Sequence, residues 1–345
     1  MKRCHIKYTI VFLLLLSLLL SALPSCQRSP REYDTSWFEY FDCFSQLTAY
    51  AQTQEEFDEY ANVCESILTE YHQLLDIYHE YDGITNLKTI NQISPKESIA
   101  IDEKLGEFLA FGKEMHQLTN GYTNMAMGSV LSLWHTARET KTLPDENVLL
   151  TANEHVDIND LLISEDLTSV QKLDPELQID AGAIGKGFVA KKIANELTAL
   201  GCESFLLNLG GNLLGHGTKS QGDAWHAGIE NPLEGGLLDY SVNISDLSLV
   251  TSGSYYRYFY VGETKYHHII HPKTLTPENY YLSVSILCPD SAVADALSTA
   301  LFSMSVEEGK KILAQREDVE ALWLFPDGSV QMTDGFMDHV QTEKK

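Results

Sequence analysis

Residues Gln178 to Ala190 read QIDAGAIGKGFVA, and the rest of the chain is organised around this stretch. It combines the end of an apolar strand, the carboxylate of Asp180 and three glycines around Lys186, and it precedes an amphipathic helix predicted over Phe188–Leu200. A glycine-rich turn between a strand and a helix lets backbone N–H groups approach an anion in front of the helix N-terminus. The spacing matches neither GxxxxGK[ST] nor GxGxxG, so this stretch alone is compatible with a structural turn or with a phosphate cradle.

The overall charge restricts the possible partners. The 345 residues include 24 Lys and Arg against 49 Asp and Glu, a formal net charge of −25, within a composition ordinary for a globular protein. So acidic a chain is not expected to bind nucleic acid or an anionic membrane surface. A phosphate-bearing ligand would need a local device, such as a metal ion or a nest of backbone N–H groups.

The N-terminus has the pattern of a targeting segment. A basic start is followed by the apolar run Ile10–Leu20, and Leu23–Cys26 resembles the lipobox of bacterial lipoproteins. We therefore predict a signal peptide over residues 1–25, lipidation at Cys26 and a protein anchored through lipid alone on the extracytoplasmic side of the cell membrane. An uncleaved anchor is the alternative, although the run is short for a membrane span.

The predicted boundaries after this segment are a polar tether over residues 26–36 and a single domain over residues 37–340. The remaining cysteines are widely separated and form no CxxC pair, which excludes the usual zinc and thioredoxin patterns. Scattered buried thiols are expected, with a disulfide as the alternative in this compartment. These cysteines are Cys43, Cys64, Cys202 and Cys288.

Helical and strand patterns divide the domain. The predicted helices are Phe57–Tyr78, Lys96–Thr119, a loop and helix over Thr123–His135, Ala292–Met304 and short pieces of the polar segment Lys141–Asp174. The predicted strands are Trp37–Tyr50, Phe205–Gly217 broken at Gly210-Gly211, Trp225–Ile229, Leu247–Thr251, Tyr281–Leu287, and the hairpins Tyr255–Val261/Lys265–Ile270 and Ala321–Phe325/Val330–Met332. This order predicts an α+β fold of mostly antiparallel sheets packed with long amphipathic helices.

One predicted helix carries a candidate cation site. Asp295 and Thr299 lie four positions apart, so their side-chain oxygens project from one face of the helix Ala292–Met304. Oxygen ligands of this kind suit a hard cation such as Mg²⁺. Asp and Thr also occur on helices as solvated or capping residues, so the pair has to be interpreted together with the rest of the chain.

Six stretches, taken together and in order, resemble the ApbE-like FAD:protein FMN transferases. The resemblance spans roughly Phe41 to Phe325, most of the chain after the targeting segment. The stretches are DIYHEYDGITNLKTIN (Asp76–Asn91), IDAGAIGKGF (Ile179–Phe188), LLNLGGNLLGHG (Leu206–Gly217), TSGSYYRYF (Thr251–Phe259), YHHIIHPKT (Tyr266–Thr274) and DSAVADALSTALF (Asp290–Phe302).

The resemblance implies an activity and a set of site residues. Such enzymes cleave the pyrophosphate of FAD and attach FMN through a phosphoester to a Ser or Thr hydroxyl of a partner protein, with Mg²⁺ required. By this resemblance, Mg²⁺ would be held by the backbone oxygen of Ala183 with the side chains of Asp295 and Thr299. His268 would be the base for the acceptor hydroxyl. The residues expected along FAD are Tyr78, Thr123, Asn124, Met125, Asp180 and Lys186.

Three positions depart from the pattern of that family. His271 stands where Asp is usual, Leu275 replaces a common glycine, and Asn124 replaces a frequent Asp. Phosphoryl transfer depends on charge neutralisation and on an in-line nucleophile, for which a metal clamp, one lysine and a histidine base suffice. A flavin transferase is therefore the leading hypothesis. The alternatives are a flavin-binding lipoprotein without transfer activity, suggested by His271, and an FAD pyrophosphatase that releases FMN and AMP.

Overall fold

The computed structural model describes residues 29–342. The predicted signal peptide and the lipidation site Cys26 lie outside these residues. No helix in the described range is long and apolar enough to cross a membrane.

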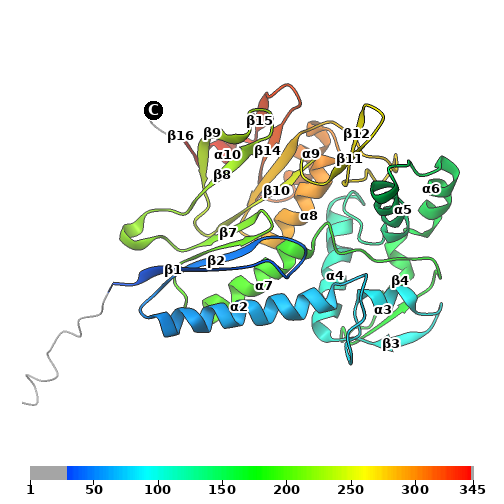
Figure 1. The fold of residues 1–345 in the computed structure, drawn as a ribbon, viewed down its shortest axis with the longest axis horizontal. Helices are drawn as coiled ribbons and strands as arrows, with labels where there is room; N and C mark the ends of the chain where they lie inside the picture. Colours follow the sequence, from blue (N-terminus) through cyan, green and yellow to red (C-terminus); the bar gives the residue numbers. More distant parts are fainter. Residues whose placement is uncertain (1–28, 343–345) are drawn as a thin grey trace, which may run out of the picture.

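An eight-stranded sheet forms the centre of the molecule (Figure 1), and each neighbouring pair of its strands is antiparallel. The α+β fold with mostly antiparallel sheets is therefore confirmed. In spatial order the strands are β1 (Arg31–Trp37), β2 (Ser45–Ala51), β6 (Phe205–Leu209), β7 (Asn212–His216), β10 (Leu247–Gly253), β13 (Ser283–Cys288), β14 (Glu320–Leu324) and β15 (Val330–Met332).

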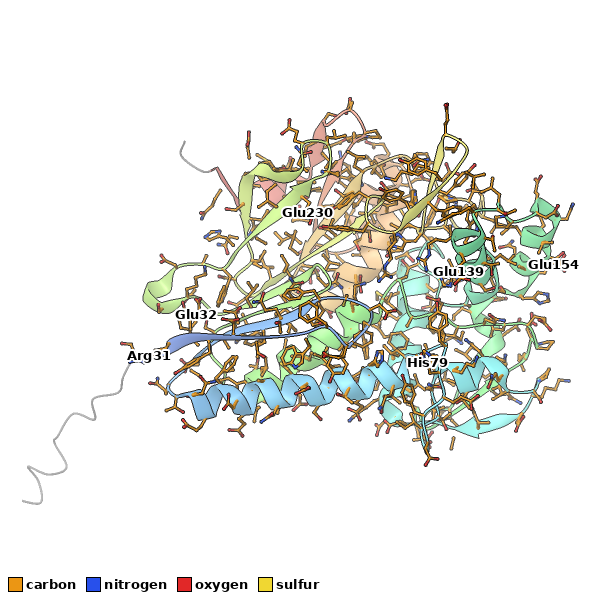
Figure 2. The ribbon with its side chains drawn as sticks, in the orientation of Figure 1. Arg31, Glu32, His79, Glu139, Glu154 and Glu230 are labelled. Carbon is orange, nitrogen blue, oxygen red and sulfur yellow. The ribbon has the colours of Figure 1, made fainter. Side chains whose placement is uncertain are left out.

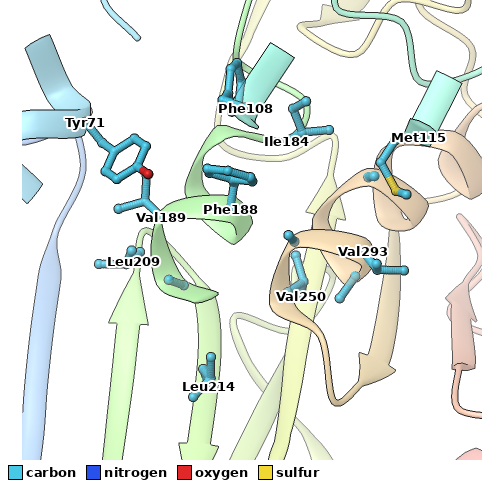
Figure 3. Close-up of a cluster of buried hydrophobic side chains, with 14 of the residues drawn as sticks. Tyr71, Phe108, Met115, Ile184, Phe188, Val189, Leu209, Leu214, Val250 and Val293 are labelled. Carbon is cyan, nitrogen blue, oxygen red and sulfur yellow. The ribbon is translucent and has the colours of Figure 1, made fainter. Parts of the chain in front are cut away.

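Long helices pack on one face of this sheet. Helix α2 (Gln54–Leu74) lies along α7 (Gly185–Ala199), which in turn packs against α8 (Ser291–Phe302). Figure 3 shows Phe188 of α7 close to Tyr71 of α2 and Phe108 of α4 (Glu103–Leu118), with ring centroids 5.9 and 5.3 Å away. These rings fix the first two turns of α7 in the core, and α7 carries the glycine motif.

A smaller sheet covers the other face. Strands β16 (Val340–Thr342), β9 (Gly236–Asn243) and β8 (His226–Asn231) form it, and its core includes Leu249 of β10 and Leu287 of β13. The next residue of β10, Val250, belongs instead to the core beneath the helices. Alternate residues of a strand point to opposite faces, so the central sheet is buried on both sides.

The remaining elements lie around the central sheet and its helices. They include the hairpin β11–β12, which packs on α5, and a small sheet in the order β3-β5-β4. Their bounds are α3 (Leu87–Gln92), β3 (Ser98–Ala100), α5 (Gly128–Thr140), α6 (Glu146–Ala152), β4 (Leu161–Ile163), β5 (Ser169–Lys172), β11 (Tyr258–Val261), β12 (Thr264–His267), α9 (Val306–Leu313) and α10 (Asp334–Met337).

Several predicted elements differ from the structure. The predicted tether is wrong from Arg31 to Ser36, because these residues pair with β2 as strand β1. Phe205–Gly217 is a hairpin rather than a broken strand, since Gly210 and Gly211 have φ of 59° and 92° and reverse the chain. The segment Lys141–Asp174 is partly helical but also contributes β4 and β5.

The helix boundaries also shift. The helix predicted over Lys96–Thr119 begins only at Glu103, where Asp102 accepts a hydrogen bond from the Lys104 N–H as its N-cap, and residues 98–100 form β3 instead. The helix predicted to reach Tyr78 ends at Leu74. The four cysteines of the described range are free thiols, and three of them are buried.

Candidate active site

The glycine motif forms the first turn of α7 rather than a loop before it. The helix begins at Gly185, three residues earlier than predicted, and its entry is a tight turn in which the N–H of Gly185 donates to Ala181 O at 2.8 Å. Asp180 starts this turn by accepting the N–H of Gly182 at Oδ1 (2.7 Å). Lys186 therefore projects from the N-terminus of a helix, where the macrodipole and the ammonium group both favour an anion.

Gly187 brings α7 into direct contact with α8. A Cβ atom at this position would lie 2.3 Å from Ser291 O and 2.4 Å from Asp295 Cβ, so only glycine allows this approach. Its N–H donates to Asp295 Oδ2 at 2.7 Å. The motif and the carboxylate, 108 positions apart in sequence, thus form one site.

The three predicted cation ligands share the junction of these two helices. Thr299 Oγ1 lies 3.4 Å from Ala183 O, and Asp295 lies one helical turn before Thr299 on α8. Two ligands of one Mg²⁺ ion lie at most about 4.2 Å apart, because each Mg–O distance is about 2.1 Å. A carbonyl, a hydroxyl and a carboxylate oxygen also form the all-oxygen set that Mg²⁺ prefers. The residues present therefore fit this cation.

The electrostatics of Asp295 agree with a role as a ligand. Burial raises the pKa of its carboxyl group, while Lys186, the Gly187 N–H and the Asn212 side chain oppose the shift. A buried carboxylate with only this partial compensation is costly in free energy, and a cation would relieve the cost. The described range contains no cluster of three His, Cys, Asp or Glu side chains, so a metal here depends on backbone and hydroxyl oxygens.

His268 lies beside two cations. It follows strand β12, and its Nδ1 is 3.3 Å from Arg257 O at the start of the same hairpin. Burial, followed by the charges of Arg257, His267 and Lys186, lowers the pKa of His268 to about 3. The imidazole is therefore neutral near pH 7, the form that accepts a proton.

Tyr78, His135 and Asp180 form the other side of the site. The exposed phenol of Tyr78 lies 3.3 Å from Nδ1 of His135, and this contact joins the loop after α2 to helix α5. Burial, then the Asp180 carboxylate, raises the pKa of Tyr78. In Figure 2, His79 marks this loop and Glu139 marks the helix. The side chains of Tyr78 and His135 are therefore placed to flank a planar ring.

The side chains of Thr123 and Met125 are buried, whereas that of Asn124 is half-buried and lines a surface pocket. Thr123 Oγ1 donates to Ala296 O of α8 at 2.6 Å, and the Asn124 amide donates to Val156 O at 2.9 Å. Met125 is 2% exposed, and its carbonyl accepts the Asp180 N–H. A ligand in that pocket would meet the Asn124 side chain, whereas contact with Thr123 and Met125 would use their backbone.

The three departures have structural roles that the structure makes visible. Nδ1 of His271 accepts the N–H groups of Lys273 and Thr274 at 3.1 and 3.2 Å, which is the turn-capping role that an Asp carboxylate would fill. Leu275 has a φ of 61°, a conformation that glycine adopts at low cost. Its carbonyl accepts the Trp134 indole N–H at 2.8 Å, which holds the loop against α5.

Two charged or polar residues near the site were not predicted. Arg257 is the first: its carbonyl oxygen lies 3.3 Å from Nδ1 of His268, and after burial its charge contributes to the lowered pKa of that imidazole. His135 is the second. Arg257 had a signal in the sequence, because it is the single cation within TSGSYYRYF; His135 had none.

Comparison with known proteins agrees with this geometry. A sequence model of the ApbE family matches residues 41–323. A protein of Treponema pallidum named FAD:protein FMN transferase is 33% identical over 270 residues, which cover 74% of this chain and 75% of the relative. A protein of the same name from Klebsiella pneumoniae is 27% identical, covering 75% of this chain and 82% of the relative.

Solved structures show the same fold. The crystal structure of the ApbE protein from Thermotoga maritima superposes with a TM-score of 0.80 at 22% identity, covering 91% of this chain and all of that one. The apo flavinyl transferase ApbE of Pseudomonas stutzeri gives a TM-score of 0.78 at 21% identity, covering 90% of this chain and 97% of that one.

Proposed function

The chain belongs to the ApbE family and is a flavin transferase, and on this premise we propose that it uses Mg²⁺ to move FMN from FAD to a Ser or Thr hydroxyl of an extracytoplasmic electron-transfer protein. The carrying observation is the junction of α7 and α8, where Ala183, Asp295 and Thr299 present three oxygens next to the N-terminus of α7. A cation held there would withdraw charge from the pyrophosphate of FAD.

The other residues of the site bind and orient the substrates. Lys186 and Arg257 supply positive charge for the phosphates in a protein whose net charge is −25. Tyr78 and His135 flank the position proposed for the flavin ring. The N–H groups of Gly185, Gly187 and Phe188 are already bonded within the protein, so the start of α7 favours phosphate mainly through the helix dipole.

In the proposed reaction, the acceptor hydroxyl oxygen forms a bond to the phosphorus of the FMN half of FAD. The pyrophosphate P–O bond breaks, and AMP leaves. Neutral His268 is placed to accept the hydroxyl proton, and its lowered pKa makes it a weaker base than an ordinary histidine. The products are AMP and a phosphoester between FMN and the acceptor.

One assay separates this function from its alternatives. The purified protein is incubated with FAD and Mg²⁺, with and without a threonine-containing acceptor protein. The amounts of AMP, free FMN and protein-bound flavin are then measured. Flavin bound covalently to the acceptor supports the transferase. FMN and AMP formed equally without acceptor would support an FAD pyrophosphatase, and intact bound FAD would support a binding protein.

The site assignment has its own control. Asp295→Ala is expected to abolish turnover that depends on Mg²⁺, since it removes the buried carboxylate at the helix junction. Full Mg²⁺-dependent turnover in this variant would refute the assignment.

We also propose that the protein is tethered to the cell membrane through a lipid on Cys26, facing the extracytoplasmic side. The basic start, apolar run and lipobox-like Leu23–Cys26 support this proposal. Cys26→Ala should prevent incorporation of radiolabelled palmitate and release the protein from the membrane fraction. Unchanged labelling would contradict it.

A further inference from the structure

A chain of hydroxyl groups connects strand β10 to helix α8 beside the candidate cation ligands. Ser252 Oγ of β10 lies 2.8 Å from Ser298 Oγ and 3.4 Å from Thr299 Oγ1. Ser298 Oγ donates to Asp295 O at 3.0 Å. Ser298 is fully buried, so its hydroxyl depends on these protein partners, whereas Ser252 and Thr299 are half-buried.

The order of these contacts determines the direction of each hydrogen bond. A hydroxyl group has one proton to donate. Ser298 gives its proton to Asp295 O, so it accepts in its contact with Ser252. Ser252 therefore donates to Ser298, and its free lone pairs face Thr299. In the contact between Ser252 and Thr299, only Thr299 is then left to donate, and its one proton has Ala183 O as a second acceptor.

We propose that Ser252 is a positioning residue for the cation, an inference that rests on the Mg²⁺ site of the proposed function. By accepting a hydrogen bond from the Thr299 hydroxyl, Ser252 leaves a lone pair of Thr299 Oγ1 directed toward the cation. The competing acceptor is Ala183 O, also 3.4 Å from Thr299 Oγ1. A cation at that carbonyl repels the proton, which leaves Ser252 as its acceptor.

The energetic role follows from competition for one proton. Without Ser252, the Thr299 proton would point to Ala183 O and occupy lone pairs of two cation ligands at once. Outer residues that orient metal ligands typically change metal affinity by about 10–100-fold when they are mutated. We expect Ser252→Ala to fall in this range.

Strand β10 also provides a matched control. Thr251, the neighbour of Ser252, points to the opposite face of β10 and pairs with Ser285 of β13 at 2.7 Å between the hydroxyl oxygens. Thr251→Val removes a hydroxyl pair of the same kind and leaves the Ser252 contacts in place. Ser252→Thr keeps the hydroxyl and serves as the conservative variant.

The test measures metal binding rather than turnover. Mn²⁺, as a substitute for Mg²⁺, is titrated into the full-length protein with and without FAD, and free Mn²⁺ is counted by electron paramagnetic resonance. We expect a Kd for Mn²⁺ raised about 10–100-fold in Ser252→Ala, restored to within about threefold in Ser252→Thr and unchanged in Thr251→Val. The affinity for FAD without metal, followed by flavin fluorescence, should be equal in all variants.

Each other outcome overturns the inference. Wild-type Mn²⁺ affinity in Ser252→Ala would remove the role of Ser252, and equal weakening by Thr251→Val would indicate a general effect on strand pairing. Asp295→Asn tests the site itself: if it leaves Mn²⁺ binding unchanged, the cation lies elsewhere and the inference about Ser252 is wrong. Failure of flavin transfer in a wild-type protein that still binds Mn²⁺ at Asp295 would instead refute the proposed function.

Discussion

Replacing Gly187 by alanine tests the contact on which the site depends. The new Cβ would lie 2.3 Å from Ser291 O, a backbone atom that cannot rotate away, so α7 and α8 would have to separate. Overpacking of this kind costs about 1–3 kcal/mol. Weakening the hydrogen bond from the Gly187 N–H to the buried Asp295 carboxylate adds about 1.5–3 kcal/mol. Higher helix propensity returns about 1 kcal/mol.

The expected result is a loss of roughly 1.5–5 kcal/mol in the free energy of unfolding, measured by urea denaturation at an unchanged m-value. Gly185→Ala is the matched control in the same helical turn. Its Cβ would meet Ala181 Cβ and Leu75 Cδ1 at 3.5 Å, which is ordinary contact, so this variant should be neutral or more stable by up to about 1 kcal/mol. Equal stability of the two variants would refute the close approach at Gly187.

Three further perturbations have definite expected results. Lys172 is fully buried and donates to Asn91 O and Leu177 O at 2.8 and 2.9 Å, so Lys172→Met should leave these carbonyls unpaired and lower the free energy of unfolding by about 2–4 kcal/mol in urea melts; an unchanged midpoint would contradict this. Burial lowers the pKa of His271, so the unfolded chain binds a proton first and the free energy of unfolding should fall as the pH drops below 6.5. In His271→Asn, whose Oδ1 accepts the same N–H groups without titrating, the free energy of unfolding should fall less over this pH range. Parallel pH profiles of the two proteins would contradict the capping role of His271. With a pKa of about 3, His268 should cause no inflection in kcat/KM for the acceptor between pH 5 and 8; an inflection that disappears in His268→Asn would exclude this reasoning.

The fold class was predictable because it depends on local patterns, whereas the grouping of Ala183 with Asp295 and Thr299 was implied only by the resemblance to the ApbE family. Helical periodicity alone places Asp295 and Thr299 on one helix face, and the glycines of Gln178–Ala190 indicate a close approach of the backbone to another group. What the sequence did not specify was the partner of that approach. Only the structure shows that Gly187 meets Ser291 and Asp295.

Errors arose where tertiary pairing overrode local appearance. Arg31–Ser36 is polar and looks like a tether, but it pairs with β2 along its whole length. Gly210-Gly211 looks like a bulge, and the left-handed φ of both residues makes it a hairpin turn instead.

In the sequence, the two halves of the site come before and after the hairpin turn at Gly235-Gly236, between β8 and β9. Ala183 and Gly187 precede that turn, whereas Asp295 and Thr299 follow it by about sixty positions. A chain opened at this turn would give two fragments, each with an incomplete set of ligands. If Mg²⁺ occupies the proposed site, adding it would favour reassociation of the fragments, because only the joined pair contains the complete ligand set. Binding at the proposed cation site would therefore depend on the association of the two fragments.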